Sequence, residues 1–305
     1  MTALVLGHKN PDTDSIVSAL SATNLYRGRG IDAEPGAQGR PAPETEFVLS
    51  RFGLQPPPEV HSVAGRDVYL VDYSDLAQAP DDFAQCRLLG IIDHHKLGDV
   101  TSSAPVECVI LPVGCSNTVI KRLHDYHQVP IPADLAGAML CAILSDTVLF
   151  KSPTCTPQDT KAAHDLARIA GIDDWQALGM DMFRAKSNLN AAPRDLIFRD
   201  FKDFNMSGKK VGIGQLELIS LSMISPELMA SLREELSRVK SEGRDSALLV
   251  ITDIMEEGSQ LLMCSDHEEL VTRALNTTVS ERMWLPGVMS RKKQVVPQLE
   301  QAFRG

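Results

Sequence analysis

The chain has 305 residues, of which 43% are hydrophobic and 23% charged, and a formal net charge of −10. This composition is that of a globular protein, and the length predicts two domains that are each large enough for a core of their own. The negative charge argues against a general nucleic-acid-binding protein, which needs a basic face to displace counterions from phosphates.

The cysteines and the hydropathy of the sequence indicate the cellular compartment of the protein. The six cysteines form no C-x-x-C pair, and Cys108 and Cys141 lie in apolar runs. This pattern predicts reduced, buried thiols rather than disulfides or a structural zinc site. The first apolar run lacks a basic lead, so no signal peptide is expected. The longest apolar run, at 135–144, is about half of what a membrane span needs. We expect a cytoplasmic protein with no membrane contact.

The first half alternates short apolar runs with longer amphipathic ones, a pattern typical of strands joined by helices around a parallel sheet. The runs do not alternate in polarity, which indicates strands buried on both faces. Expected strands are 2–6, 67–72, 88–93 and 106–111, and expected helices are 15–26, 116–126, 134–144 and 157–169.

The polar stretch "RAKSNLNAAPRD" contains the expected linker, residues 189–193. Beyond it the pattern resumes with expected strands at 209–218, 246–254 and 260–264 and a long helix at 225–242. The sequence therefore predicts an α/β protein with a larger first domain, residues 1–188, and a smaller second one, residues 194–305.

Candidate metal ligands stand at the ends of these elements. His8, Asp72, the pair Asp93-His94 and His95 follow expected strands, and Asp146 ends a helical run. Ligands bind outside the carboxyl ends of parallel strands, and neighbouring strands lie about 5 Å apart, so such residues can share an ion. Pro11 favours an extended Asn10, which places Asp12 and Asp14 in a loop that enters the first helix.

Taken singly, these residues have simpler explanations. Asp14 could cap the helix that follows, Asp12 could form an Asx turn, and Asp72 could do either. The pair His94-His95 could be a polar loop pair. The remaining histidines, which are expected at the surface, are His61, His124, His127, His164 and His267. These explanations do not account for the convergence of so many such residues in one fold. Carboxylates brought together without a cation would repel one another, so we favour a metal site.

The mixture of imidazole and carboxylate without cysteine suits Mn²⁺, Co²⁺ or Mg²⁺ better than structural zinc. Two such ions that share a carboxylate are suited to phosphoryl chemistry.

The motifs together resemble one known family. "GHKNPDTDS", the strand that ends in "VD", "DHH", "SDT" and the late "SRKKQ" occur in the order found in family II inorganic pyrophosphatases, members of the DHH phosphoesterase superfamily. The resemblance covers nearly the whole chain. It implies an N-terminal DHH domain, a smaller C-terminal domain of the DHHA2 type and an active site in the cleft between them.

The resemblance also implies roles for single residues. His8 and Asp12 would hold one metal ion, Asp14, His94 and Asp146 the second, and Asp72 would bridge them. His95 would lie beside the substrate, as a hydrogen-bond donor to phosphate or as the acid for the leaving group. Asp93 would orient an imidazole. The phosphates would be gripped by Lys202, Arg291 and Lys292.

The implied cofactors are two Mn²⁺ per subunit, with Co²⁺ as a possible substitute and Mg²⁺ as an additional or substrate-bound activator. The implied partners are the substrate pyrophosphate and a second copy of the chain, bound through the first domain. The "SRKK" stretch taken alone is more simply a solvated basic patch.

Two positions depart from the family pattern. Tyr73 and Ser74 follow "VD" where the family commonly has His-Asn, and Lys96 follows "DHH" where Arg is frequent. These changes affect the residues around the ligands, not the ligands themselves.

Two other functions compete with pyrophosphate hydrolysis. A different DHH phosphoesterase, such as an exopolyphosphatase or an oligonucleotide phosphodiesterase, would use the same metal ligands, but the glycine-rich "GGGH"-like segment of the nuclease-type members does not occur in the sequence. A non-catalytic metal or phosphate sensor would not need His95 and the cationic residues.

Overall fold

The computed structural model describes residues 2–280 and 283–304. The chain divides into two compact units, which are Met1–Phe150 with Thr154–Met182 and Lys151–Pro153 with Phe183–Gly305. The main division therefore falls just before the linker expected at 189–193, and the domain limits taken from the sequence stay a prediction. The prediction of an α/β protein with two sheets is confirmed.

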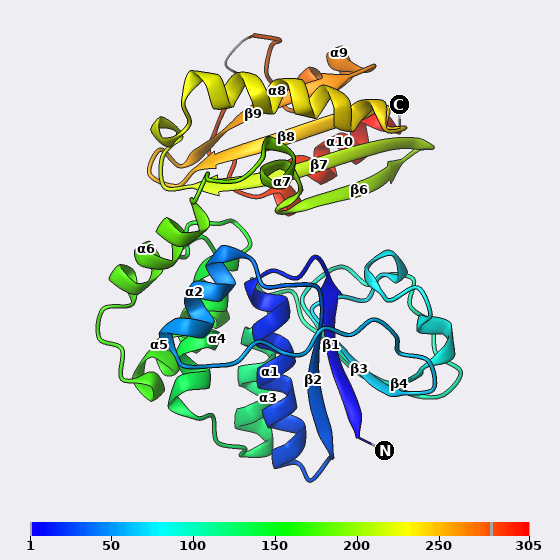
Figure 1. Ribbon diagram of the computed structural model, residues 1–305, viewed down its shortest axis with the longest axis vertical. Helices are drawn as coiled ribbons and strands as arrows, with labels where there is room; N and C mark the ends of the chain where they lie inside the picture. Colours follow the sequence, from blue (N-terminus) through cyan, green and yellow to red (C-terminus); the bar gives the residue numbers. More distant parts are fainter. Residues whose placement is uncertain (1, 281–282, 305) are drawn as a thin grey trace. The chain divides into compact units, whose positions relative to one another are not determined.

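The first unit is built on a five-stranded sheet in the order β2-β1-β3-β4-β5 (Figure 1). All neighbouring strands run parallel. The strands are β1 (Ala3–Lys9), β2 (Ala33–Gln38), β3 (Asp67–Val71), β4 (Arg87–Asp93) and β5 (Glu107–Ile110). β2 was not expected, because its sequence "AEPGAQ" carries no apolar run. Proline and glycine are tolerated there since β2 lies at the sheet edge.

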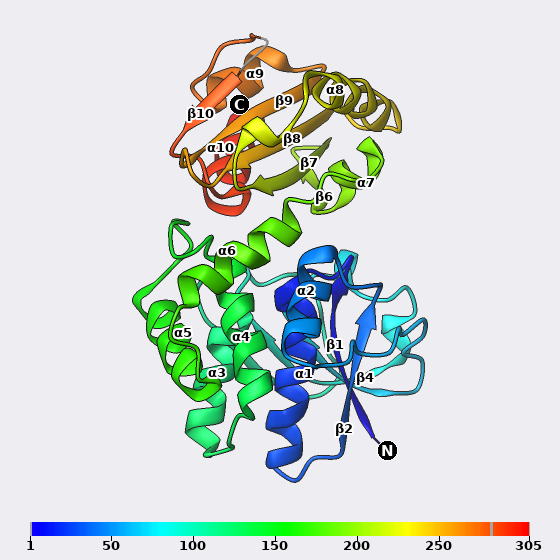
Figure 2. The same ribbon diagram turned by 60° about the vertical axis from the view of Figure 1, so that its left-hand side comes forward.

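Helices cover one face of this sheet. They are α1 (Thr13–Gly28), α2 (Pro43–Arg51), α3 (Ser116–His127), α4 (Ala133–Asp146) and α5 (Pro157–Ala170). The next helix, α6 (Trp175–Lys186), contains the division between the two units, which falls after Met182. α1 contacts β1 and β2, α4 packs on α1, and α5 packs on α4 (Figure 2). α1 is buried on nearly all sides, and its many Ala and Ser residues allow this close packing.

Irregular segments cover the opposite face. Their apolar side chains, which include Tyr73, Ala79 and Phe83, form one core cluster with Leu4, Leu70 and other strand residues. Burial on both faces explains why the strands have apolar runs that do not alternate.

The second unit has its own five-stranded sheet, in the order β10-β9-β8-β7-β6. β7 and β8 run parallel, whereas the other neighbours are antiparallel. The strands are β6 (Phe201–Met206), β7 (Lys209–Leu218), β8 (Ser246–Asp253), β9 (Gly258–Ser265) and β10 (Met283–Pro286). The central strand β8 is buried along its whole length.

This sheet is also covered on both faces. Its helices are α7 (Pro193–Phe198), α8 (Pro226–Ser241), α9 (Glu268–Ala274) and α10 (Val296–Phe303). One core cluster contains apolar residues of α7 and α8, and another contains those of α9 and α10. Only α8, the longest of these helices, was expected from the sequence, because the others are too short to show a clear period.

Two sequence-based expectations about burial were wrong. Cys108 is exposed, because it lies on the edge strand β5, whereas Cys141 is buried in α4 as expected. His124 is buried rather than on the surface, and its ring nitrogens lie 3.0 and 3.1 Å from the carbonyl oxygens of Val129 and Ser21. Among the described residues, no helix is long and apolar enough to span a bilayer.

Candidate metal centre

The end of β1 and the start of α1 bring the first two candidate ligands together. Asp12 caps α1, because its Oδ1 accepts a hydrogen bond from the Ser15 N–H at 2.9 Å. Its other oxygen lies 3.6 Å from Nε2 of His8. The ring of His8 is oriented by a 2.7 Å contact between Nδ1 and the Lys9 carbonyl. One aspartate thus caps the helix and still presents an oxygen to the site.

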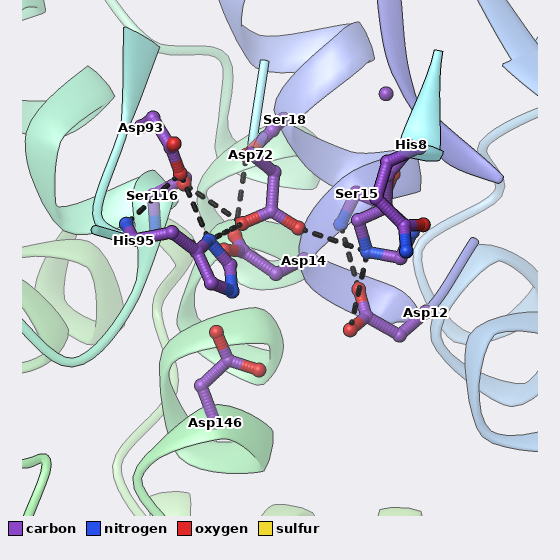
Figure 3. A network of polar contacts seen from close by, with 12 residues as sticks. His8, Asp12, Asp14, Ser15, Ser18, Asp72, Asp93, His95, Ser116 and Asp146 are labelled. Carbon is purple, nitrogen blue, oxygen red and sulfur yellow. Dashed lines mark hydrogen bonds and ion pairs between the residues drawn. The ribbon is translucent and has the colours of Figure 1, made fainter. Parts of the chain in front are cut away.

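Asp72 lies at the centre of the site, directly after β3 (Figure 3). Its Oδ2 is 3.3 Å from Nε2 of His8, and its Oδ1 is 3.5 Å from Nε2 of His94. The two oxygens of one carboxylate therefore face two imidazoles. Asp72 has φ of 67°, a left-handed conformation that is uncommon for a residue other than glycine and is concentrated at functional sites.

The end of β4 positions the histidine pair. The Nδ1 of His94 lies 3.1 Å from the Val113 carbonyl, which leaves its Nε2 directed at the carboxylates of Asp14, Asp72 and Asp146 at 3.5–4.0 Å. His95 instead binds Asp93, whose Oδ1 is 2.9 Å from the His95 Nδ1. Both rings also face Oδ1 of Asp72, His94 at 3.5 Å and His95 at 3.7 Å, but only His95 makes the close contact with Asp93.

Asp14 lies in the first turn of α1, fully buried, and is held by the start of α3. Its carboxylate accepts hydrogen bonds from the backbone N–H of Ser116 at 2.7 Å and of Asn117 at 3.1 Å. The Asn117 side-chain amide donates to it at 2.7 Å, and the Cys115 thiol at 3.0 Å. The positive end of the helix and these donors stabilise the ionised carboxylate.

The site has an excess of buried negative charge. Burial opposes charge on His8, but the carboxylates of Asp12 and Asp72 outweigh it and raise the pKa of His8 to about 10. Burial and the charge of Asp72 raise the pKa of Asp14 to about 7. Burial and neighbouring carboxylates, Asp14 first, also raise the pKa of Asp146 well above its ordinary value. A bound cation would offset the negative charge of these carboxylates.

The positions of the ligand atoms fit metal ions. Three groups each keep their potential ligand atoms within 4.8 Å, and they are His8 with Asp12 and Asp72, Asp72 with His94 and His95, and Asp14 with Cys115 and Asp146. The buried Nε2 of His8 has no hydrogen-bond partner among the described residues, although it lies between two carboxylates. A ligand nitrogen without its metal would have this environment.

Comparison with known proteins agrees with the site. A model of the N-terminal domain of the DHH family matches residues 2–143, and a DHHA2 domain model matches residues 180–302. A probable manganese-dependent inorganic pyrophosphatase of Archaeoglobus fulgidus is 45% identical over 98% of this chain and 97% of its own length. The manganese-dependent inorganic pyrophosphatase of Methanocaldococcus jannaschii is 44% identical over 99% of each chain.

The chain belongs to the manganese-dependent inorganic pyrophosphatases.

A solved structure from Methanococcus jannaschii, assigned to the family II inorganic pyrophosphatases, superposes with a TM-score of 0.89 at 43% identity over the whole of both chains. An exopolyphosphatase-related protein of Bacteroides fragilis shares the fold, with a TM-score of 0.52, but is only 13% identical over 99% of this chain and 92% of its own. The resemblance seen in the sequence to family II inorganic pyrophosphatases is thereby confirmed.

The structure brings together the six residues expected as metal ligands in this pyrophosphatase family, and the three expected cationic residues lie in the second unit. Lys202 is half-buried on β6, and Lys292 is exposed in the single π-helical turn Arg291–Val295. Arg291 is buried, and its guanidinium donates to the carbonyls of Asp200 at 2.8 Å and Ile213 at 3.0 Å and to the Asp200 carboxylate at 2.7 Å. The phosphate-binding role of the three residues stays a prediction.

Sequence reasoning missed the residues that hold Asp14. Ser116 was expected only as a helix start, and Cys115 and Asn117 were not assigned any role. The one available signal was the run of small polar residues "GCSN" before a helix, which is typical of an anion-binding helix start. The departure at Ser74 also has a structural explanation, since its hydroxyl accepts a hydrogen bond from the Gly98 N–H at 3.0 Å and ties down the loop after His95.

Proposed function

We propose that the chain catalyses the hydrolysis of inorganic pyrophosphate to two orthophosphates and that its first unit holds two Mn²⁺ ions for this reaction. The observation that carries the proposal is the position of Asp72, whose two oxygens face His8 and His94 on opposite sides. A carboxylate in this position can serve two ions at once.

In this proposal the first ion is held by His8, Asp12 and Asp72. The second is held by Asp14, His94 and Asp146, with Asp72 shared. Bound Mn²⁺ lowers the pKa of water and neutralises charge on the phosphate under attack. Co²⁺ can replace Mn²⁺ because the ligand atoms are the same, and Mg²⁺ accompanies the substrate, whose oxygens it prefers.

We propose that His95 donates a proton to the phosphate that leaves. The Asp93 carboxylate accepts a hydrogen bond from Nδ1 of His95 and favours the charged imidazole, which leaves Nε2 as a donor. The side chain of His95 is 28% exposed, compared with 7% for His94, so it is the histidine that a substrate can reach.

Lys202, Arg291 and Lys292 are proposed to contribute positive charge to substrate binding. Pyrophosphate is small and highly charged, so cations have to supply most of its binding energy. For Arg291 this role requires that some of its contacts with Asp200 and Ile213 are exchanged for phosphate oxygens.

The test is phosphate release from pyrophosphate, tripolyphosphate and a dinucleotide, measured after chelation and after addition of Mn²⁺ or Mg²⁺. We expect pyrophosphate to be hydrolysed fastest, no turnover after chelation, and recovery with Mn²⁺. Faster release from tripolyphosphate would indicate an exopolyphosphatase, and cleavage of the dinucleotide a phosphodiesterase. Metal binding without any hydrolysis would indicate a sensor.

The proposal includes a homodimer formed through the first domain, a cytoplasmic location and no nucleic-acid partner, all of which rest on the family resemblance and on composition. Light scattering on the purified chain tests the dimer, and retention on a DNA column tests the last point.

A further inference from the structure

One short segment contacts several metal-ligand candidates. It consists of residues 113–118, which end the loop after β5 and form the first turn of α3, and is called here the β5–α3 turn. The Val113 carbonyl lies 3.1 Å from Nδ1 of His94. Ser116 donates from its backbone N–H to Asp14 at 2.7 Å and from its hydroxyl to Asp72 at 2.9 Å. The position of three candidate ligands therefore depends on where this turn lies.

The β5–α3 turn is held by a carboxylate that touches none of these ligands. Asp159, fully buried in the first turn of α5, accepts a hydrogen bond from the Gly114 N–H at 2.9 Å and from the Thr118 hydroxyl at 2.6 Å. The approach is close, because a Cβ on Gly114 would lie 3.0 Å from the Asp159 carboxylate. One buried side chain thus fixes both the beginning and the end of the turn.

Asp159 is itself held in place by the start of α5. It forms a capping box with Thr156, whose backbone N–H and hydroxyl donate to its carboxylate at 2.7 and 2.6 Å. With four donors around a fully buried carboxylate, the side chain cannot turn away without losing several hydrogen bonds.

Other residues orient His8 and Asp12, the proposed ligands of the first ion. The ring of His8 is oriented by the Lys9 carbonyl, and the carboxylate of Asp12 by the Ser15 N–H. Neither contact involves the β5–α3 turn or α5. Two of the first ion's three proposed ligands are therefore oriented independently of the turn, and only the shared Asp72 contacts it, through the Ser116 hydroxyl.

We propose that Asp159 is a positioning residue for the second metal ion, acting through the β5–α3 turn on His94, Asp14 and Asp72. Outer contacts of this kind fix the direction of ligand atoms, and their loss typically lowers metal affinity by about 10- to 100-fold. The inference rests on the proposed two-ion site but concerns a residue that contacts no ion and no substrate.

The test uses Asp159→Asn and Thr118→Val in the full chain. Both changes preserve side-chain shape, and the second removes only the hydrogen bond at the end of the turn. Free Mn²⁺ is followed by electron paramagnetic resonance during stepwise titration of metal-free protein. We expect one of the two binding steps to weaken by about 10- to 100-fold in Asp159→Asn, and less in Thr118→Val, while the other step, which depends on the turn only through Asp72, weakens clearly less.

The control variant changes Thr160, the residue next to Asp159. Its hydroxyl lies in the same turn of α5 but contacts the Cys155 thiol at 3.8 Å and not Asp159, so the matched control is Thr160→Val, and we expect both Mn²⁺ steps to stay unchanged. To assign the weakened step, Asp159→Asn is combined with Asp12→Ala, which disables the first ion's site and leaves the second to be measured alone.

Different outcomes overturn different proposals. A parent protein that binds fewer than two Mn²⁺ would contradict the two-ion site. If the parent binds two ions and Asp159→Asn and Thr118→Val do the same with parental affinities, or if both steps weaken equally, the positioning role is wrong. The same holds if Thr160→Val reproduces the loss. Should Asp159→Asn fail to fold, the Thr118→Val titration decides alone.

Discussion

The Nε2 atom of His8 lies 3.3 Å from Oδ2 of Asp72, although His8 lies near the end of β1 and Asp72 directly follows β3. β1 and β3 are adjacent parallel strands, so their carboxyl ends meet at the same edge. The other oxygen of Asp72 faces His94, which follows β4, the next strand along. Three neighbouring strands thus supply one continuous row of ligand atoms.

The central position of Asp72 in this row predicts the effect of removing its side chain. Asp72→Ala should weaken both Mn²⁺ binding steps, because the carboxylate faces both sets of ligands. Equilibrium dialysis with Mn²⁺ provides the measurement. Asp75→Asn, an exposed residue in the same loop, is the control and should bind two ions as the parent does. Loss of a single ion from Asp72→Ala would show that the carboxylate is not shared.

The two adjacent histidines should behave differently. His94→Gln should lower Mn²⁺ content, since its Nε2 faces three carboxylates, whereas His95→Gln should keep the metal and lower kcat by about 10²- to 10⁴-fold, the range for a lost general acid. Metal analysis and steady-state kinetics on the same preparations separate the two effects. Equal loss of metal from both variants would mean that the roles are wrongly assigned.

Metal binding should release protons and depend on pH. Burial and the charge of Asp72 raise the pKa of Asp14 to about 7 in the metal-free chain. The folded state then favours the protonated carboxyl, so the stability from this group is present below the unfolded pKa of about 4 and is lost as pH rises to about 7. Mn²⁺ requires the carboxylate, so its affinity should rise with pH up to about 7.

Calorimetry in buffers of different ionisation enthalpy measures the proton release directly. The pKa of His8, raised to about 10, adds a proton that must also leave when the ring binds a metal. Deprotonation of either group should therefore raise the affinity for Mn²⁺. A Mn²⁺ affinity that does not change between about pH 5.5 and 7.5 would contradict this account.

Arg291 should contribute to activity and to stability. If it binds phosphate, Arg291→Ala loses a charge-assisted contact worth about 1.5–3 kcal/mol, and kcat/KM should fall at least tenfold, with metal content intact. The same change removes the guanidinium from the Ile213 carbonyl and from Asp200, whose carbonyl keeps the Gln215 N–H as a donor. The lost hydrogen bonds should cost about 1–3 kcal/mol of unfolding free energy.

Kinetics and thermal unfolding on the same variant separate these two effects. Lys293→Ala, in the same turn but with no assigned contact to substrate, is the control and should keep kcat/KM within about twofold of the parent. A lower Tm with parental kcat/KM for Arg291→Ala would make this arginine purely structural.

The sequence by itself determined which candidate metal ligands the structure brings together and which class of fold carries them. Apolar runs that do not alternate specify strands buried on both faces, and the polar residue after each run lies at the carboxyl end of the sheet. These are local properties of the chain, so His8, Asp72 and His94 could be recognised without coordinates. The edge strand β2 and the short helices were missed because propensity and period are weak in short or edge elements.

Only the tertiary structure decided what surrounds each ligand. Asp14 is held by Ser116 and Asn117, more than a hundred positions away along the chain, and Asp159 holds the turn between them. Arg291, read from the sequence as a phosphate ligand, is buried against Asp200. Hydrogen-bond partners depend on strand order and helix packing, which no local pattern encodes. For this reason the ligands were predictable and the residues that orient them were not.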